Sequence, residues 1–397
     1  MSELLSTKQD QFVMTEINHQ SQQSETSETP RVRIIASPKS WIVSDAESQL
    51  RRAAELPGVV YAVGMPDLHP GKGIPIGAAI MSDGMVYPEL AGNDIGCGMT
   101  LWQTALPGKK LKLNRWVKKL SGLESRPEGG SATAVAAAGL TPGPYDTSLG
   151  TIGGGNHFAE LQTVEEIHDD EVCHAISLDE SQLMLLVHSG SRGLGESVLR
   201  AYVNRHGFAG VAEQTEDAAA YLRAHDHAVA WAALNRALIA ERFLDMLGTH
   251  GQPVINLCHN SICPVQWNGS RHWLHRKGAA PSDAGPIILP GSRGTLTYLI
   301  QPVGDQADNA YSVAHGAGRK WARSDARANL ERRYSPESLR RTDLGGRVIC
   351  DDKALLYEES PQAYKNVDAV VRDLIDAGLV RIIATFRPLI TYKTKHE

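Results

Sequence analysis

The pattern of apolar and polar positions separates a polar N-terminal stretch from a long region of strands and helices. Residues 1–30 are rich in Ser, Gln, Thr and Glu. Such a stretch cannot bury enough apolar surface to offset its ordering entropy, so we expect a disordered tail. From residue 31 onwards, short apolar segments alternate with helical patterns, and neither a linker nor a repeat of roughly 20–50 residues interrupts them. We therefore predict one mixed α/β domain.

Individual elements follow from the period of the apolar positions. RVRIIA and GVVYAV read as strands on either side of a helix, SDAESQLRRAAEL, with Ser44 as its N-cap. Residues 212–248 are alanine-rich and carry an apolar stripe at helical spacing, which predicts a long helix. A second helix is predicted over residues 367–375, with Gly378 at its C′ position. RIIATF and LITYK are expected to form two closing strands.

Three apolar strands each run into a glycine-rich or serine-rich loop that carries a polar group. LMLLV leads into a loop that starts at His188, PIILP into one that starts at Gly291, and YSVA into one that starts at His315. Glycine lets backbone N–H groups approach an anion closely. These loops could therefore hold phosphate groups.

Composition narrows the class of protein. The chain has 397 residues, with 40 Lys+Arg against 45 Asp+Glu and a net charge of -5. This balance excludes a binder that depends on overall positive charge, but not a local basic groove. Five cysteines without a CxxC pair indicate a reducing compartment, so we expect a cytoplasmic protein. No apolar run approaches the length of a membrane span, and no membrane association is expected.

Two glycine-rich motifs carry candidate metal ligands. GNDIGCGM places Asp94 and Cys97 three residues apart, where a carboxylate and a thiolate could share a metal; a turn aspartate beside a buried cysteine is the alternative. LGTIGGGNHFAEL presents Asn156, His157 and Glu160 after three glycines, which favours a loop that faces a ligand over a helix start capped by asparagine.

Histidines complete the candidate site. His188 stands at a strand end, and His259 follows another apolar strand in NLCHNSIC. One thiolate, one carboxylate and three histidines could hold two metal ions, which suits phosphoryl chemistry. His315 in AHGAGR has small neighbours that would expose its ring, as a covalent phosphoramidate requires. RHWLHRKG reads either as a solvated turn or as a basic patch with Trp273, suited to RNA phosphates and a stacked base.

The ordered motifs resemble one known family. GNDIGCGM, LGTIGGGNHFAEL, VHSGSRGLG, HN at 259–260, HRKGA, PGSRGT, HGAGR and PQAYK occur in the order typical of the RtcB family of RNA ligases, and most resemble the branch encoded beside release factor H. The resemblance runs from about residue 32 to Lys393. It implies that residues 31–397 form a single catalytic domain of the α+β type, with layered β-sheets surrounded by helices.

The resemblance also implies an activity. Members of the family use GTP and two Mn²⁺ ions to join RNA 3′-phosphate or 2′,3′-cyclic phosphate ends to 5′-hydroxyl ends, through a guanylylated histidine and an RNA-3′-pp-5′-G intermediate. The histidine matches His315. The metal ligands match Asp94, Cys97, His157, His188 and His259. The residues that match the nucleotide pocket are Asn156, Phe158, Ala159, Glu160, Asn260, Pro290, Gly291, Ser292, Arg293, Thr297, Gly316, Ala317, Gly318, Tyr364 and Lys393.

Some positions depart from the family pattern, and some assignments stay general. Arg293 stands where methionine is usual after PGS, and it could reach phosphate or alter guanine packing. Thr297 replaces a more common serine. The basic residues expected near the RNA are Arg192, Arg276, Lys277 and Arg319. RNA repair or tRNA splicing is the expected role, with a possible link to release factor H or an activating protein.

Two other functions fit part of the pattern. A two-metal phosphoesterase or cyclic phosphodiesterase would use the same ligands but leave His315 and the guanine-pocket motifs without a role. A non-catalytic RNA-end binder that serves translation rescue would need no intact ligand set.

Overall fold

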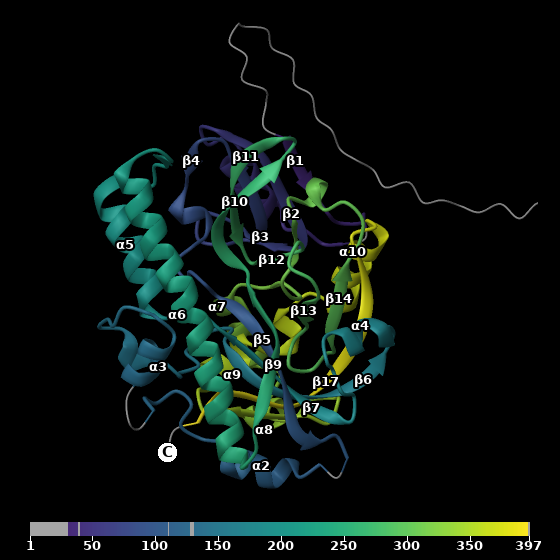
Figure 1. Ribbon diagram of the computed structural model, residues 1–397. Helices are drawn as coiled ribbons and strands as arrows, with labels where there is room; N and C mark the ends of the chain where they lie inside the picture. The colour runs from purple at the N-terminus through teal and green to yellow at the C-terminus, as the bar shows by residue number, and fades with distance from the viewer. Residues whose placement is uncertain (1–30, 39, 110, 128–130, 396–397) are drawn as a thin grey trace, which may run out of the picture.

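The computed structural model describes residues 31–38, 40–109, 111–127 and 131–395, so the predicted tail of residues 1–30 lies outside the described part. Two large sheets and ten α-helices make up the described part of the chain (Figure 1). Only β1–β2 and β16–β17 pair in parallel, and the other strand pairs are antiparallel. This confirms the predicted mixed α/β fold with layered sheets and surrounding helices.

The five-stranded sheet has the order β1-β2-β3-β11-β10. Its strands are β1 (Arg31–Ile34), β2 (Val59–His69), β3 (Ile76–Ser82), β10 (Asn260–Trp267) and β11 (Ser270–Lys277). Helix α1 (Ser44–Ala54) connects β1 to β2, as the sequence predicts. Ser44 is the first helical residue rather than the N-cap: Val43 precedes it and supplies no side-chain cap. Asp45 and Glu47 in the first turn interact favourably with the helix dipole instead.

The eight-stranded sheet has the order β13-β14-β17-β6-β7-β5-β9, with β16 paired to β17. Its strands are β5 (Gly98–Pro107), β6 (Phe158–Ile167), β7 (Gln182–Ser189), β9 (Gly251–Cys258), β13 (Ile287–Pro290), β14 (Thr297–Pro302), β16 (Arg347–Cys350) and β17 (Val380–Thr394). The two closing strands predicted from the sequence are the single strand β17. Its register against β6 shifts on both sides of Arg387, and Pro388, which has no N–H to donate, accounts for the apparent break.

Helix α6 (Glu216–Leu247) packs against β5, β7 and β9 of the large sheet and also reaches β10 (Figure 1). Thr215 caps its first turn by accepting a hydrogen bond from Ala218 N–H, and Gly248 ends it in a left-handed conformation. This confirms the predicted long helix, except that β8 (Val211–Ala212) precedes it. Helix α10 (Val367–Asp376) is likewise confirmed, with Gly378 at C′ and a φ of 69°.

The remaining elements are short connections. They are α2 (Leu113–Lys119), α3 (Ala132–Ala137), α4 (Asp170–Ala175), α5 (Gly193–His206), α7 (Arg323–Leu330), α8 (Pro336–Leu339), α9 (Lys353–Glu358), β4 (Met85–Val86), β12 (Ala279–Pro281), β15 (Ser312–Ala314) and four 3₁₀ turns, Pro88–Leu90, Asp146–Ser148, Ala307–Asn309 and Pro361–Ala363. Within the described residues, no helix combines the length and the apolar character that a bilayer span requires.

Four strand ends of the large sheet meet at one edge. The register pairs Gly98 of β5 with both Ser189 of β7 and Cys258 of β9, and Phe158 of β6 with His188 of β7. Neighbouring antiparallel strands alternate in direction, so the starts of β5 and β6 lie beside the ends of β7 and β9. The topology therefore gathers motifs that are more than 150 residues apart in sequence.

Candidate active site

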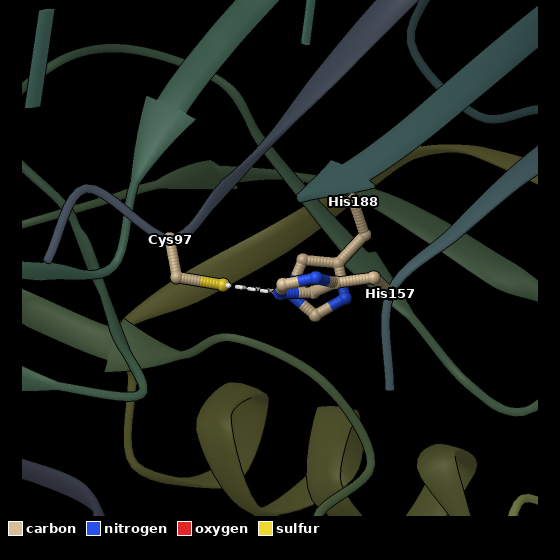
Figure 2. Close-up of side chains that lie close together, drawn as sticks. All are labelled: Cys97, His157 and His188. Carbon is tan, nitrogen blue, oxygen red and sulfur yellow. Dashed lines mark hydrogen bonds between the residues drawn. The ribbon is translucent and has the colours of Figure 1, made fainter. Parts of the chain in front are cut away.

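Three candidate metal ligands form a compact buried cluster at this edge (Figure 2). The sulfur of Cys97 lies 3.5 Å from Nε2 of His157 and 3.3 Å from Nε2 of His188. All three donor atoms lie within 4.8 Å of one another. Oδ2 of Asp94 lies 2.9 Å from Nε2 of His157, which brings a carboxylate to the same point.

His259 and the second oxygen of Asp94 extend the cluster. The ring of His259 is buried and lies 5.2 Å, centroid to centroid, from that of His188, while its N–H donates to the carbonyl of Cys97. Oδ1 of Asp94 is buried and has no hydrogen-bond partner among the described residues. A buried carboxylate oxygen without a donor is costly, and a cation would offset that cost. The structure thus brings all five predicted ligands together.

The electrostatics of the cluster suit a cation. Burial lowers the pKa of His188 and of His259 well below the ordinary value, so both rings are neutral and keep a lone pair for a metal. Burial, and then the charge of Asp94, raise the pKa of the Cys97 thiol. A divalent cation would reverse that preference and favour the thiolate. Sulfur, nitrogen and oxygen donors together fit Mn, Zn, Fe or Co.

Two consecutive polar residues of α6, which sequence reasoning missed, hold the metal loops in place. The guanidinium of Arg236 is fully buried and donates to the carbonyls of Gly96, at 2.8 Å, and Ser189, at 3.1 Å. Asn235 donates to the carbonyl of Gly190 and accepts from a backbone N–H near the third glycine loop. A polar pair on the buried face of an amphipathic helix is the signal that could have revealed them.

The candidate nucleophile lies beside this cluster. The ring of His315, which follows β15, is 4.6 Å from that of His259, and its Nδ1 lies 2.7 Å from Oδ2 of Asp67. The His315 side chain is 12% exposed, less than its small neighbours predicted, because β2 covers it. A side chain at Gly318 would collide with the carbonyl of Asp67 at 2.3 Å, so glycine permits this close approach.

Asp67 and its neighbours were not found by sequence reasoning. Asp67 is fully buried in β2, and Lys365 Nζ donates to the two carbonyls that flank it, those of Pro66 and Leu68. The backbone N–H of Lys365 also donates to Gly318. Lys365 therefore joins the strand that carries Asp67 to the loop that carries the histidine.

A cavity of about 930 Å³ opens next to the histidines and extends to Glu160 and Tyr364. Most of the predicted nucleotide-pocket residues line it. They are Asn156, Phe158, Glu160, Pro290, Gly291, Ser292, Arg293, Gly316, Ala317, Gly318, Tyr364 and Lys393.

Three residues of the predicted pocket lie behind the cavity wall. Ala159 is buried in β6, and Thr297 is buried and accepts a hydrogen bond from Gln162. Asn260 donates to the carbonyl of Asp94 and accepts from Gly278 N–H, so it supports a metal loop.

Two buried carboxylates give the cavity opposite characters. Burial raises the pKa of Glu160 to about 7. Glu359, which sequence reasoning missed, is also buried, and burial alone would raise its pKa. Lys393, at 3.5 Å, and Arg319, at 3.0 Å, outweigh that effect and hold the pKa of Glu359 at about 2. Glu359 is thus a fixed anion that orders cations along the wall.

The predicted basic patch in RHWLHRKG differs in the structure. The segment is β11, an internal strand between β3 and β10, so its side chains are covered on both sides. Arg276 is 4% exposed and donates to Ser312 and to the carbonyl of Tyr311. Trp273 is also buried. Neither residue is available to RNA, which corrects the expectation for Arg276.

The other cations predicted to contact RNA have internal partners. Lys277 is partly buried and donates to the carbonyl of Ile74, and burial lowers its pKa to about 8. Arg192 is partly buried, and its side chain lies against the backbone of Gly153, in the loop before His157. Arg319 lies beside Glu359 and lines the cavity.

The fold and site define a metal-binding enzyme that acts on the phosphates of a nucleotide. A family model for the tRNA-splicing ligase RtcB matches residues 49–140 and 143–394. The chain therefore belongs to the RtcB family of RNA ligases, which use a metal and GTP. It joins RNA 3′-phosphate or cyclic phosphate ends to 5′-hydroxyl ends.

Curated relatives agree with this assignment. The chain is 46% identical to the RNA-splicing ligase RtcB2 of Escherichia coli ATCC 25922 over 359 residues, which cover 90% of this chain and 94% of the relative. It is 30% identical to the RNA-splicing ligase RtcB of Escherichia coli K12 over 410 residues, covering 89% and 95% of the two chains. The tRNA-splicing ligase RtcB of Thermococcus kodakarensis is 29% identical over 436 residues, covering 86% of this chain and 89% of the relative.

Proposed function

We propose that this ligase activates RNA ends through a GMP group carried on His315, with two Mn²⁺ ions held by Asp94, Cys97, His157, His188 and His259. The observation that carries the proposal is the position of His315. Its ring lies beside His259 of the ligand cluster and borders the cavity that leads to Glu160. A nucleotide in that cavity would place phosphates between the histidine and the cations.

The contact with Asp67 defines which nitrogen reacts. A carboxylate 2.7 Å from Nδ1 of His315 favours the tautomer with its proton on Nδ1, which leaves the lone pair on Nε2. Nε2 then attacks the α-phosphorus of GTP. A P–N bond forms, the bond to the β-phosphate oxygen breaks, and pyrophosphate leaves. Bound Mn²⁺ would supply charge neutralisation for this step.

The second and third steps transfer GMP and seal the RNA. A 3′-phosphate oxygen attacks the phosphorus on His315, which breaks the P–N bond and forms RNA-3′-pp-5′-G. The 5′-hydroxyl then attacks the 3′-phosphorus, loses its proton and displaces GMP. A 2′,3′-cyclic phosphate must first be opened by water. Glu160 accepts hydrogen bonds from the guanine base in this scheme, and Lys393 and Tyr364 border the same cavity.

RNA would approach through the mouth of the cavity. Trp41, which is 53% exposed, lies there together with Lys72 and Arg323. An exposed indole among cations suits single-stranded RNA, because bases stack on it and phosphates pair with the charges. Arg192 and Arg319 lie deeper, near the metal loops and Glu359 respectively.

Labelling with α-³²P-GTP and Mn²⁺ tests the proposal. The native chain should become covalently labelled in the absence of RNA and should then seal an oligonucleotide with 3′-phosphate and 5′-hydroxyl ends. Release of a phosphate product without labelling would support a phosphoesterase instead, and RNA binding without either reaction would support an end binder. Resemblance to the branch encoded beside release factor H supports a role in RNA repair with that factor. A sealing assay with and without the factor tests the link.

A further inference from the structure

Arg293 has an unused hydrogen-bond donor beside the nucleotide cavity. It stands where the resembled family usually has methionine, in the loop after β13, and it is 5% exposed. Its Nη2 donates to the carbonyl of Leu356 in α9 at 2.8 Å, which anchors the side chain. Its Nη1 is buried and has no hydrogen-bond partner among the described residues. Arg293 is also part of the cavity wall.

A buried guanidinium nitrogen without an acceptor costs free energy, and such groups usually have a functional explanation. Burial lowers the pKa of Arg293, whereas the charges of Cys350, Glu359, Tyr364 and Glu160 raise it. The charge of Arg293 in turn lowers the pKa of Glu160. Arg293 therefore acts at the Glu160 end of the cavity, the end that we assign to the base.

The chemistry of guanine identifies the missing acceptor. A carboxylate such as Glu160 can accept from guanine N1–H and the 2-amino group. The adjoining edge carries two acceptors, O6 and N7, and arginine is the usual partner for this pair. Adenine has an amino donor in place of O6, which would oppose the guanidinium.

We propose that Arg293 binds the O6 and N7 edge of the guanine base and contributes to the selection of GTP over ATP. This inference rests on the proposed function, because it requires GTP in this cavity. A phosphate contact for Arg293 is the competing possibility, and analogues that differ only in the base separate the two.

The experiment measures kcat/KM for guanylylation of the full chain with GTP, 7-deaza-GTP, ITP and ATP, without RNA. 7-Deaza-GTP lacks the N7 acceptor, so the native chain should use it roughly 10-fold less efficiently than GTP, as expected for one hydrogen bond to a charged donor. In Arg293→Met that penalty should vanish, while kcat/KM for GTP falls roughly 10-fold or more and discrimination against ATP weakens.

ITP supplies the matched control. It lacks the 2-amino group that Glu160 would contact but keeps O6 and N7, so Arg293→Met should leave the ITP penalty unchanged. Arg293→Lys keeps a cation and should retain part of the 7-deaza penalty. Metal content and thermal unfolding are measured for each variant to show that it is folded.

The outcomes separate this inference from the proposed function. Native protein that uses GTP and 7-deaza-GTP equally would overturn the role of Arg293, as would an unchanged 7-deaza penalty in Arg293→Met. Equal losses for all four nucleotides in the variant would assign Arg293 to phosphate and also overturn it. Absence of labelling with every nucleotide in native protein would instead refute the proposed function.

Discussion

Glu160→Gln should make the metal-free, nucleotide-free protein more stable at pH 8 while weakening GTP binding. Glu160 is 3% exposed; its Oε1 accepts from Gln162 at 2.7 Å and its Oε2 from Thr391 at 2.5 Å. These two bonds do not compensate for the desolvation of the carboxylate, because burial raises the pKa from 4.5 to about 7. The free protein thus contains a destabilised anion at neutral pH.

The sign and size of the effect follow from proton linkage. Between pH 4.5 and about 7 the folded chain holds a proton on Glu160 that the unfolded chain has released. Its contribution to stability therefore falls as the pH rises through this window, and the full cost applies above pH 7. At about 1.4 kcal/mol per pKa unit the cost is roughly 3 kcal/mol. Glutamine does not titrate, so the variant should gain up to that amount at pH 8, and the gain should shrink towards pH 4.5.

Urea unfolding of native and variant protein at a series of pH values between 5 and 8 measures this difference. Glu55→Gln, at the exposed end of α1, is the control and should follow the native pH dependence. In parallel, GTP affinity of Glu160→Gln should fall roughly 10-fold or more, because guanine N1–H loses a charged acceptor. A stability difference that does not change with pH, or a variant less stable than native protein at pH 8, would refute the reasoning.

Four further predictions address the metal site, the nucleophile and the tail. His315→Ala should abolish covalent GMP labelling with metal content near normal; normal labelling would place the nucleophile elsewhere. Cys97→Ala should lose much of the metal, measured by elemental analysis, and nearly all sealing activity, because a bridging thiolate would contact both ions. Arg236→Met should lower the free energy of unfolding by about 3–5 kcal/mol, since buried acceptors lose their donor at roughly 1–3 kcal/mol each. Arg223→Met, on the exposed face of the same helix, should change it by less than about 0.5 kcal/mol in a urea titration. A chain that starts at Arg31 should still be labelled and seal a simple oligonucleotide; a soluble but inactive truncation would contradict this.

The motifs at strand ends could be predicted because their signals are local. An apolar run followed by glycine and a histidine indicates a strand and an adjoining loop, and β7 with His188 and β15 with His315 follow that pattern. The helices α6 and α10 were also predictable, since their apolar periods and end signals lie within one segment. The gathering of the motifs at one edge comes from the antiparallel order of β5, β6, β7 and β9, which no single segment specifies.

The residues that support the site could not be predicted because their partners are distant in sequence. Asp67 lies in MPDLH, an apolar strand pattern in which one carboxylate has no local partner, and its contact with His315 spans 248 positions. The basic residues of β11 misled for the same reason. A charged strand such as RHWLHRK resembles a solvated turn until Ser312 and the carbonyl of Tyr311 are known to accept hydrogen bonds from Arg276.

These supporting contacts imply that the free site is costly to build. Oδ1 of Asp94 and Nη1 of Arg293 are buried without partners among the described residues, and Glu160 is buried with a pKa raised to about 7. Each of these groups is one that a cation or a guanine nucleotide would satisfy in the proposed reaction. Ligands that bind the folded chain only must then stabilise it, in proportion to the logarithm of their concentration over Kd. Arg236 and Lys365 hold the empty loops in position by donating to backbone carbonyls. The binding free energy of metal and GTP can therefore go into the reaction geometry rather than into ordering the loops.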